Sequence, residues 1–128
     1  MIKNNNRPVF LDLARIRLPI TALISIAHRI AGIVLFLSIP FAIYLLDLSL
    51  SSQRGYNYVQ GLLGHVSIKL LVIFIFWALA HHAFAGLRVL LIDFGVGVER
   101  DEARRTAWVI AIGSVVSLVM IAGVLLWL

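Results

Sequence analysis

The chain of 128 residues is 62% hydrophobic and only 13% charged, and its formal net charge at pH 7 is +5. A soluble domain of this length could not bury so much apolar surface in one core, so the composition excludes a soluble globular protein and indicates an integral membrane protein. The chain contains no cysteine, which excludes a disulfide framework and a thiolate-bound metal or cluster.

Three long apolar stretches cover residues 19–48, 62–92 and 106–128. Each is long enough for a transmembrane helix, which needs about 20 residues. The apolar runs are continuous and do not alternate with polar residues, so a β-barrel is excluded. The sequence therefore predicts an all-α integral membrane protein, with residues 1–128 forming a single membrane-anchor domain of three transmembrane helices.

The basic residues are distributed unevenly around these stretches. They gather before the first stretch and between the second and the third, as Lys3, Arg7, Arg15, Arg17, Arg100, Arg104 and Arg105. The connection between the first two stretches carries Arg54 alone, and no charge follows the third stretch. The positive-inside rule therefore predicts a cytoplasmic N-terminus and a periplasmic C-terminus. This topology accounts for the positive charge, so no nucleic-acid partner is expected.

Residues 1–18 mix apolar side chains with charged ones. We expect this amphipathic segment to lie on the cytoplasmic side, either along the membrane interface or against a soluble partner. Attraction to anionic lipid would hold it there in either case. Pro19, which follows, suits the first turn of a helix because a missing N–H costs nothing at that position.

The first apolar stretch carries three polar side chains near its beginning, Ser25, His28 and Arg29. Ser25 and Arg29 are four residues apart and share a helix face, which Gly32 continues. Arg29 lies roughly 15 Å along the axis from the start of the helix. One reading is a guanidinium that snorkels to the interface. The other, which we favour, is a polar pocket that binds a ligand with carbonyl or carboxylate groups. Pro40 is expected to bend the helix later on.

Residues 47–61 are expected to form an outer loop, because turn-forming serines and a glycine occur there together with Tyr56 and Tyr58 as interface aromatics. His65 and Lys69 are read as polar residues of the outer interface.

The second stretch contains ionisable residues deep inside an apolar segment, and such residues indicate a functional site. His82 shares a helix face with the small residues Ala78, Ala85 and Gly86. This pattern favours two readings equally. His82 is an axial haem ligand beside a flat slot, or it is a histidine that hydrogen-bonds across a closely packed helix interface. The first two stretches run in opposite directions, so His28 and His82 are expected in the same leaflet.

Arg88 shares a helix face with His81 and not with His82. Its expected partners are a haem propionate, a lipid phosphate or Asp93. Gly95 and Gly97 are expected to end the second helix, and residues 93–105 to form a charged connector. The third stretch has no ionisable residue, and its small-residue pair, Gly113 and Ser117, indicates helix packing.

Two separated segments carry a family resemblance. The first reads RPVFLDLARIRLPITALISIAHRIAG, the second reads HAFAGLRVLLIDFG, and SLSSQRGY lies between them. Over nearly its whole length the chain resembles the large cytochrome b membrane-anchor subunit of bacterial succinate dehydrogenase, respiratory complex II. The resemblance implies that His82 is an axial ligand of haem iron, that His28 and Arg29 lie near the haem propionates, and that Ser25 and Arg29 bind ubiquinone. The family often has a histidine where this chain has Val89, and commonly a tyrosine where it has His81.

The resemblance also implies a function and partners. The chain would anchor a flavoprotein subunit and an iron–sulfur subunit to the bacterial inner membrane, and haem b would be shared with a small anchor subunit that supplies the second histidine. His28 is the alternative second ligand within the chain. Two rival functions remain: the anchor of a quinol:fumarate reductase, and a haem-free small transporter or assembly protein.

Overall fold

The computed structural model describes residues 17–127, and the amphipathic segment expected over residues 1–18 lies almost wholly outside them. The described residues form four helices, α1 (Ile20–Ser51), α2 (Gln53–Gly64), α3 (Val66–Asp93) and α4 (Arg100–Trp127), without a strand among them. Three of these helices, α1, α3 and α4, are long and apolar enough to cross a membrane. The predicted all-α membrane protein with three transmembrane helices is therefore confirmed.

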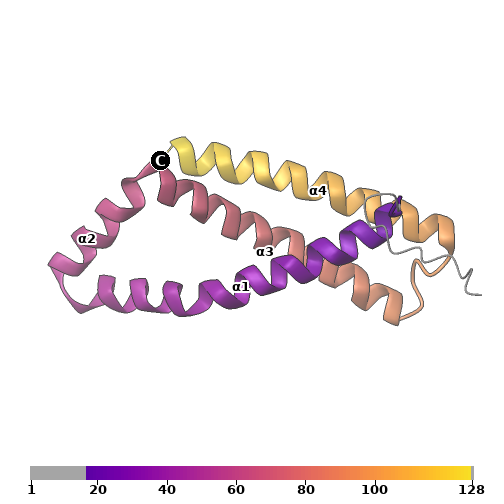
Figure 1. Ribbon diagram of the computed structural model, residues 1–128, viewed down its shortest axis with the longest axis horizontal. Helices are drawn as coiled ribbons and strands as arrows, with labels where there is room; N and C mark the ends of the chain where they lie inside the picture. Colours follow the sequence, from indigo (N-terminus) through magenta and orange to yellow (C-terminus); the bar gives the residue numbers. More distant parts are fainter. Residues whose placement is uncertain (1–16, 128) are drawn as a thin grey trace, which may run out of the picture.

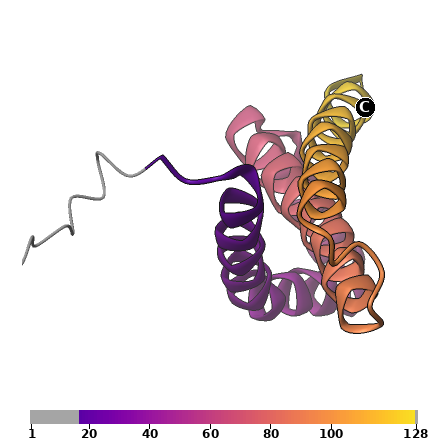
Figure 2. The same ribbon diagram turned by 90° about the vertical axis from the view of Figure 1, so that its right-hand side faces the viewer.

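Helix α1 crosses α3, α4 packs along α3, and the short α2 joins α1 to α3 at one end of the bundle (Figure 1). The beginnings of α1 and α4 lie together at the opposite end, as the perpendicular view also shows (Figure 2). We call this the basic end, because Arg17, Arg100, Arg104 and Arg105 all lie on the segments that meet there. Helix α3 packs against both α1 and α4 and is thus the central helix of the bundle.

Small residues hold the helices close together. The buried apolar cluster consists of Ile24, Ala85, Ala107 and Ile110, so each long helix contributes to it. Alanine at two of these four positions lets the backbones approach closely, which is the usual way in which helices pack in a membrane, where burial of apolar side chains gives little driving force. Most large apolar side chains are instead exposed on the outside of the bundle. This surface suits lipid or partner helices rather than water.

The prediction of a loop over residues 47–61 was wrong. Helix α1 continues to Ser51, and α2 begins at Gln53, so Ser52 alone separates them. The Ser52 side chain accepts a hydrogen bond from the backbone N–H of Gly55 at 3.1 Å and caps the new helix. Gly55 is buried, and its backbone lies so close to α1 that an added Cβ would collide with the carbonyl oxygen of Leu48. The residues read as turn formers thus form a helix cap and a tight helix–helix corner.

The predicted end of the second span is confirmed at Gly95. The N–H of Gly95 donates to the Ile92 carbonyl and the N–H of Val96 to the Leu91 carbonyl, both at 2.9 Å. This pair of bonds is a Schellman motif, which needs a left-handed residue, and Gly95 has φ +81°. The charged connector is shorter than expected, because α4 already begins at Arg100, where two acidic residues in the first turn favour a helix N-terminus.

Candidate functional site

The imidazole rings of His28 and His82 stack against each other between α1 and α3. Their centroids are 4.2 Å apart and their planes differ by 26°. Both side chains are partly buried. The structure thus brings together two of the histidines that the sequence singled out, at a crossing of the first two membrane spans.

Each of these histidines lies against a glycine of the opposite helix. A Cβ added to Gly32 on α1 would be 3.1 Å from Cε1 of His82, and one added to Gly86 on α3 would be 3.6 Å from Nε2 of His28. In both helices the glycine follows its own histidine by four residues, and the two segments read HRIAG and HAFAG. Because the helices run in opposite directions, the crossing has an approximate two-fold symmetry, which the sequence alone had not indicated.

The His82 ring is fixed by a hydrogen bond to the backbone of α1. Its Nδ1 lies 3.2 Å from the carbonyl oxygen of His28. A carbonyl oxygen can only accept, so Nδ1 carries the proton, and the lone pair of the neutral ring is on Nε2. A histidine that ligates a metal usually donates its other ring N–H in this way. His82 therefore has the tautomer that an axial ligand of haem iron requires.

The donor set fits a haem. Within residues 17–127 no group of three or more His, Cys, Asp or Glu side chains could hold a metal ion. A macrocycle supplies four of the six iron ligands itself, so this chain needs to provide only one imidazole nitrogen if another subunit provides the sixth ligand. The small residues expected beside His82 have another role, however. Ala78 and Ala85 are both buried in the helix packing, each with 2% of its surface exposed, and do not leave an open slot.

The stacked rings do not suit two axial ligands of one iron. Axial imidazoles bind from opposite faces of a macrocycle, whereas the rings of His28 and His82 lie face to face with a centroid distance of 4.2 Å. Among residues 17–127, the Nε2 atom of His28 is buried and has no hydrogen-bond partner. It lies near Gly86, where a polar group of a bound molecule or a water would satisfy it.

Ser25 and Arg29 lie on the outer surface of α1. Both side chains are exposed, and they share a face of the helix as their spacing predicts. This face is distinct from the buried one on which Ile24 and Ala31 lie. A ligand or a partner subunit can therefore reach Ser25 and Arg29 directly.

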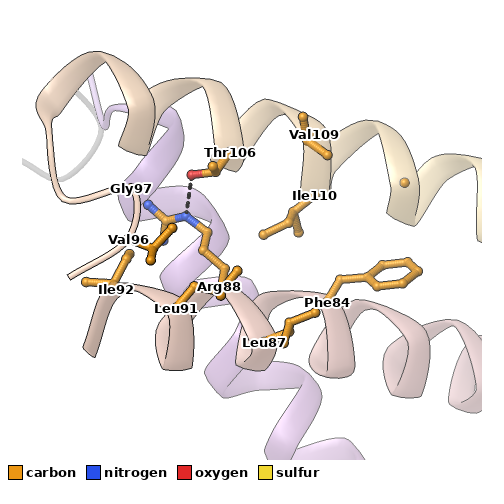
Figure 3. A pocket seen from close by; sticks show the side chains of 11 residues that line it. Phe84, Leu87, Arg88, Leu91, Ile92, Val96, Gly97, Thr106, Val109 and Ile110 are labelled. Carbon is orange, nitrogen blue, oxygen red and sulfur yellow. Dashed lines mark hydrogen bonds between the residues drawn. The ribbon is translucent and has the colours of Figure 1, made fainter. Parts of the chain in front are cut away.

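Arg88 bonds to α4. Its Nε donates to the Thr106 hydroxyl at 3.1 Å and its Nη2 to the Ala103 carbonyl at 3.2 Å. The Arg88 side chain also lines an apolar pocket of about 420 Å³ between α3 and α4 (Figure 3). The sequence had suggested a propionate, a phosphate or Asp93 as its partner. Which residues of the third helix lie opposite Arg88 depends on the register between α3 and α4, and the sequence does not reveal it.

His81 is the functional candidate that sequence reasoning left without a role. It is buried, with 4% of its surface exposed, and its Nδ1 lies 2.8 Å from the Ser114 hydroxyl oxygen. The Trp77 indole N–H donates to the Ser114 carbonyl at 3.0 Å. His81 thus faces α4 while His82 faces α1. The sequence did not indicate this pair, because the pairing depends on the register between α3 and α4, and the small-residue pattern pointed to Gly113 and Ser117 instead.

The comparisons with known proteins agree with this architecture. The family described as succinate dehydrogenase/fumarate reductase transmembrane subunit matches residues 3–121. The chain belongs to this family. The family resemblance read from the sequence motifs is confirmed.

This chain matches several relatives over most of its length. It is 39% identical to the succinate dehydrogenase cytochrome b556 subunit of Coxiella burnetii, over 97% of this chain and 99% of the relative. It is 32% identical to the cytochrome b556 subunit of Paracoccus denitrificans, over 93% and 92%. The cytochrome b560 subunit of Reclinomonas americana is 36% identical, over 83% and 77%. The similarity is thus to whole subunits and not to a shared fragment.

Proposed function

We propose that this chain is the large membrane-anchor subunit of a bacterial succinate dehydrogenase, and that it supplies one haem ligand and part of a ubiquinone site. The observation that carries the proposal is the fixed His82 imidazole, whose Nδ1–H is hydrogen-bonded to the His28 carbonyl, which leaves Nε2 as the nitrogen with the lone pair. The names of the relatives, cytochrome b subunits of succinate dehydrogenase, support it.

His82 would ligate the iron of haem b through Nε2. Haem supplies a one-electron carrier inside the membrane. His28 and Arg29 would lie near the haem propionates, and the unsatisfied Nε2 of His28 is consistent with that role. Since His28 stacks on His82, the second axial histidine would come from a small anchor subunit, as the resemblance implies.

Ser25 and Arg29 would form this chain's part of the ubiquinone site. Their exposed positions, one helix turn apart on α1, allow a hydroxyl and a guanidinium to hydrogen-bond the same quinone carbonyl. The guanidinium would stabilise negative charge that develops on the oxygen as the quinone is reduced. Arginine stays protonated at neutral pH, so the proton would come from another group.

The proposed partners are the iron–sulfur and flavoprotein subunits at the basic end, the small anchor subunit, and membrane lipids on the remaining apolar surface. The chain itself has no cysteine to hold a cluster, so electrons from succinate must arrive through other subunits. The basic end would face the cytoplasm in the bacterial inner membrane, with the end of α4 in the periplasm.

The direction of the reaction depends on redox potentials that the chain does not set alone. The family name covers both succinate dehydrogenase and fumarate reductase, and the relatives named above favour succinate dehydrogenase. Family membership also favours an anchor subunit over a haem-free small transporter.

The test is purification of the affinity-tagged chain from membranes in mild detergent. We expect a flavoprotein, an iron–sulfur protein and a second small membrane protein to co-purify with succinate:quinone reductase activity. Purification of the intact chain without these subunits, or without flavin and iron–sulfur signals, would contradict the proposal.

A further inference from the structure

Two glycines in equivalent positions differ in how tightly they contact a histidine. At Gly86, an added Cβ would make an ordinary van der Waals contact of 3.6 Å with His28. At Gly32, an added Cβ would lie 3.1 Å from Cε1 and 3.5 Å from Nδ1 of His82, so that the ring would have to move by a few tenths of an ångström. The approximate two-fold symmetry of the crossing is therefore broken at the ring of His82.

The His82 ring is held on three sides by one turn of α1. The His28 carbonyl accepts a hydrogen bond from the Nδ1–H group, the His28 ring covers one face, and Gly32 lies next to the Cε1 edge. A carbonyl oxygen in a helix is itself fixed by the helix hydrogen bonds, so it is a more rigid acceptor than a side chain. These three contacts together determine the orientation of the ring about its Cβ–Cγ bond.

We infer that Gly32 is a positioning residue for the haem ligand: the turn from His28 to Gly32 sets the angle and the basicity of the His82 imidazole. The inference rests on the proposed ligation of haem by His82. Groups that hydrogen-bond to the second ring nitrogen of a ligating histidine fix its tautomer and raise its basicity, and so tune the metal that it binds. Gly32 acts only by leaving room for the ring, so its effect must pass through His82.

The test compares Gly32→Ala with its matched control Gly86→Ala in the purified multi-subunit complex. Both replacements add one methyl group to the glycine of a His-x3-Gly turn, and both improve helix propensity. The measurements are the low-temperature EPR g values of the oxidised haem and its midpoint potential. We expect both quantities to shift more in Gly32→Ala than in Gly86→Ala, where the added Cβ makes only an ordinary contact of 3.6 Å with His28. Equal behaviour of the two variants, shifted or unshifted, would overturn the inference.

If Gly32→Ala does not assemble, a second variant tests the positioning role of Gly32. Replacing His28 by Ala in the same chain removes the ring that confines His82 from the other side, so His82 can move away from the new methyl group. We expect Gly32→Ala/His28→Ala to restore a haem-containing complex with altered g values. Failure of this variant to assemble would mean that Gly32 serves only helix packing, and would overturn the inference.

The wild-type complex and His82→Ala separate this inference from the proposed function. If the wild type lacks low-spin haem, or if His82→Ala retains it unchanged, His82 is not the ligand and the proposed function fails. If His82→Ala loses the haem while Gly32→Ala leaves its g values and potential unchanged, only the positioning role of Gly32 fails.

Discussion

His81 and Ser114 form a buried hydrogen bond that joins α3 to α4. Nδ1 of His81 lies 2.8 Å from Oγ of Ser114, and that hydroxyl donates its own proton to the Ile110 carbonyl at 2.7 Å. Because a hydroxyl has only one proton, His81 must be the donor in the contact with Ser114. The two adjacent histidines thus have separate roles: His81 links α3 to α4, and His82 faces α1 and the proposed haem.

Replacing Ser114 by Ala would leave the Nδ1–H group of His81 buried without an acceptor. We expect a loss of about 0.6–2 kcal/mol in the stability of the helix bundle, which lowers the melting temperature of the complex in detergent. The matched control is Ser117→Ala, since Ser117 bonds only to the Gly113 carbonyl of its own helix. An unchanged haem spectrum in Ser114→Ala is also expected, and its loss would contradict the separate roles of the two histidines.

Gly55 and Gly61 lie on the same short helix but differ in their surroundings. A Cβ at Gly55 would collide with the Leu48 carbonyl oxygen, whereas one at Gly61 would meet nothing within 4 Å. We expect Gly55→Ala to destabilise the α1–α2 corner and to lower the melting temperature. Gly61→Ala should leave it unchanged or raise it, because alanine favours a helix by up to about 1 kcal/mol over glycine. Equal melting temperatures for the two variants would contradict the helix-corner geometry.

His28→Ala distinguishes the two possible sources of the second haem ligand. The variant removes the stacked ring but keeps the backbone carbonyl to which His82 donates. If the small anchor subunit supplies the second ligand, low-spin haem should persist at the wild-type ratio of haem to flavin, with shifted properties. Conversion to high-spin haem, or loss of haem from an otherwise intact complex, would show that His28 is itself the ligand.

Ser25→Ala and Arg29→Lys should impair quinone reduction without affecting succinate oxidation. Loss of one preorganised donor typically costs about 10²–10³ in rate, and lysine cannot replace the planar fork of a guanidinium. The measurement is succinate:quinone reductase activity against succinate:dye activity in the same preparation. Ser38→Ala is the control, because Ser38 bonds to the Leu35 carbonyl later on the same helix. A parallel fall in both activities would argue against a quinone site at Ser25 and Arg29.

The sequence predicted the features that depend on composition and periodicity. The three spans follow from long apolar runs, and the approach of His28 to His82 follows from their similar depth in antiparallel helices. The partners of Arg88 and His81 could not be predicted in this way, since both depend on the register of α4 against α3. The helix α2 was missed because serine, glycine and asparagine favour turns locally, while the cap at Ser52 and the burial of Gly55 stabilise a helix.

The proposed ligation of haem iron by His82 is tested by the reduced-minus-oxidised optical spectrum of the purified complex, measured for the wild type and for His82→Ala. His65→Ala is the control, because His65 lies at the α2–α3 junction, away from the His28–His82 crossing. We predict a low-spin b-type signal in the wild type and in His65→Ala, and its loss in His82→Ala while the flavoprotein and iron–sulfur subunits remain bound. A signal of unchanged intensity and position in His82→Ala would show that His82 is not a haem ligand.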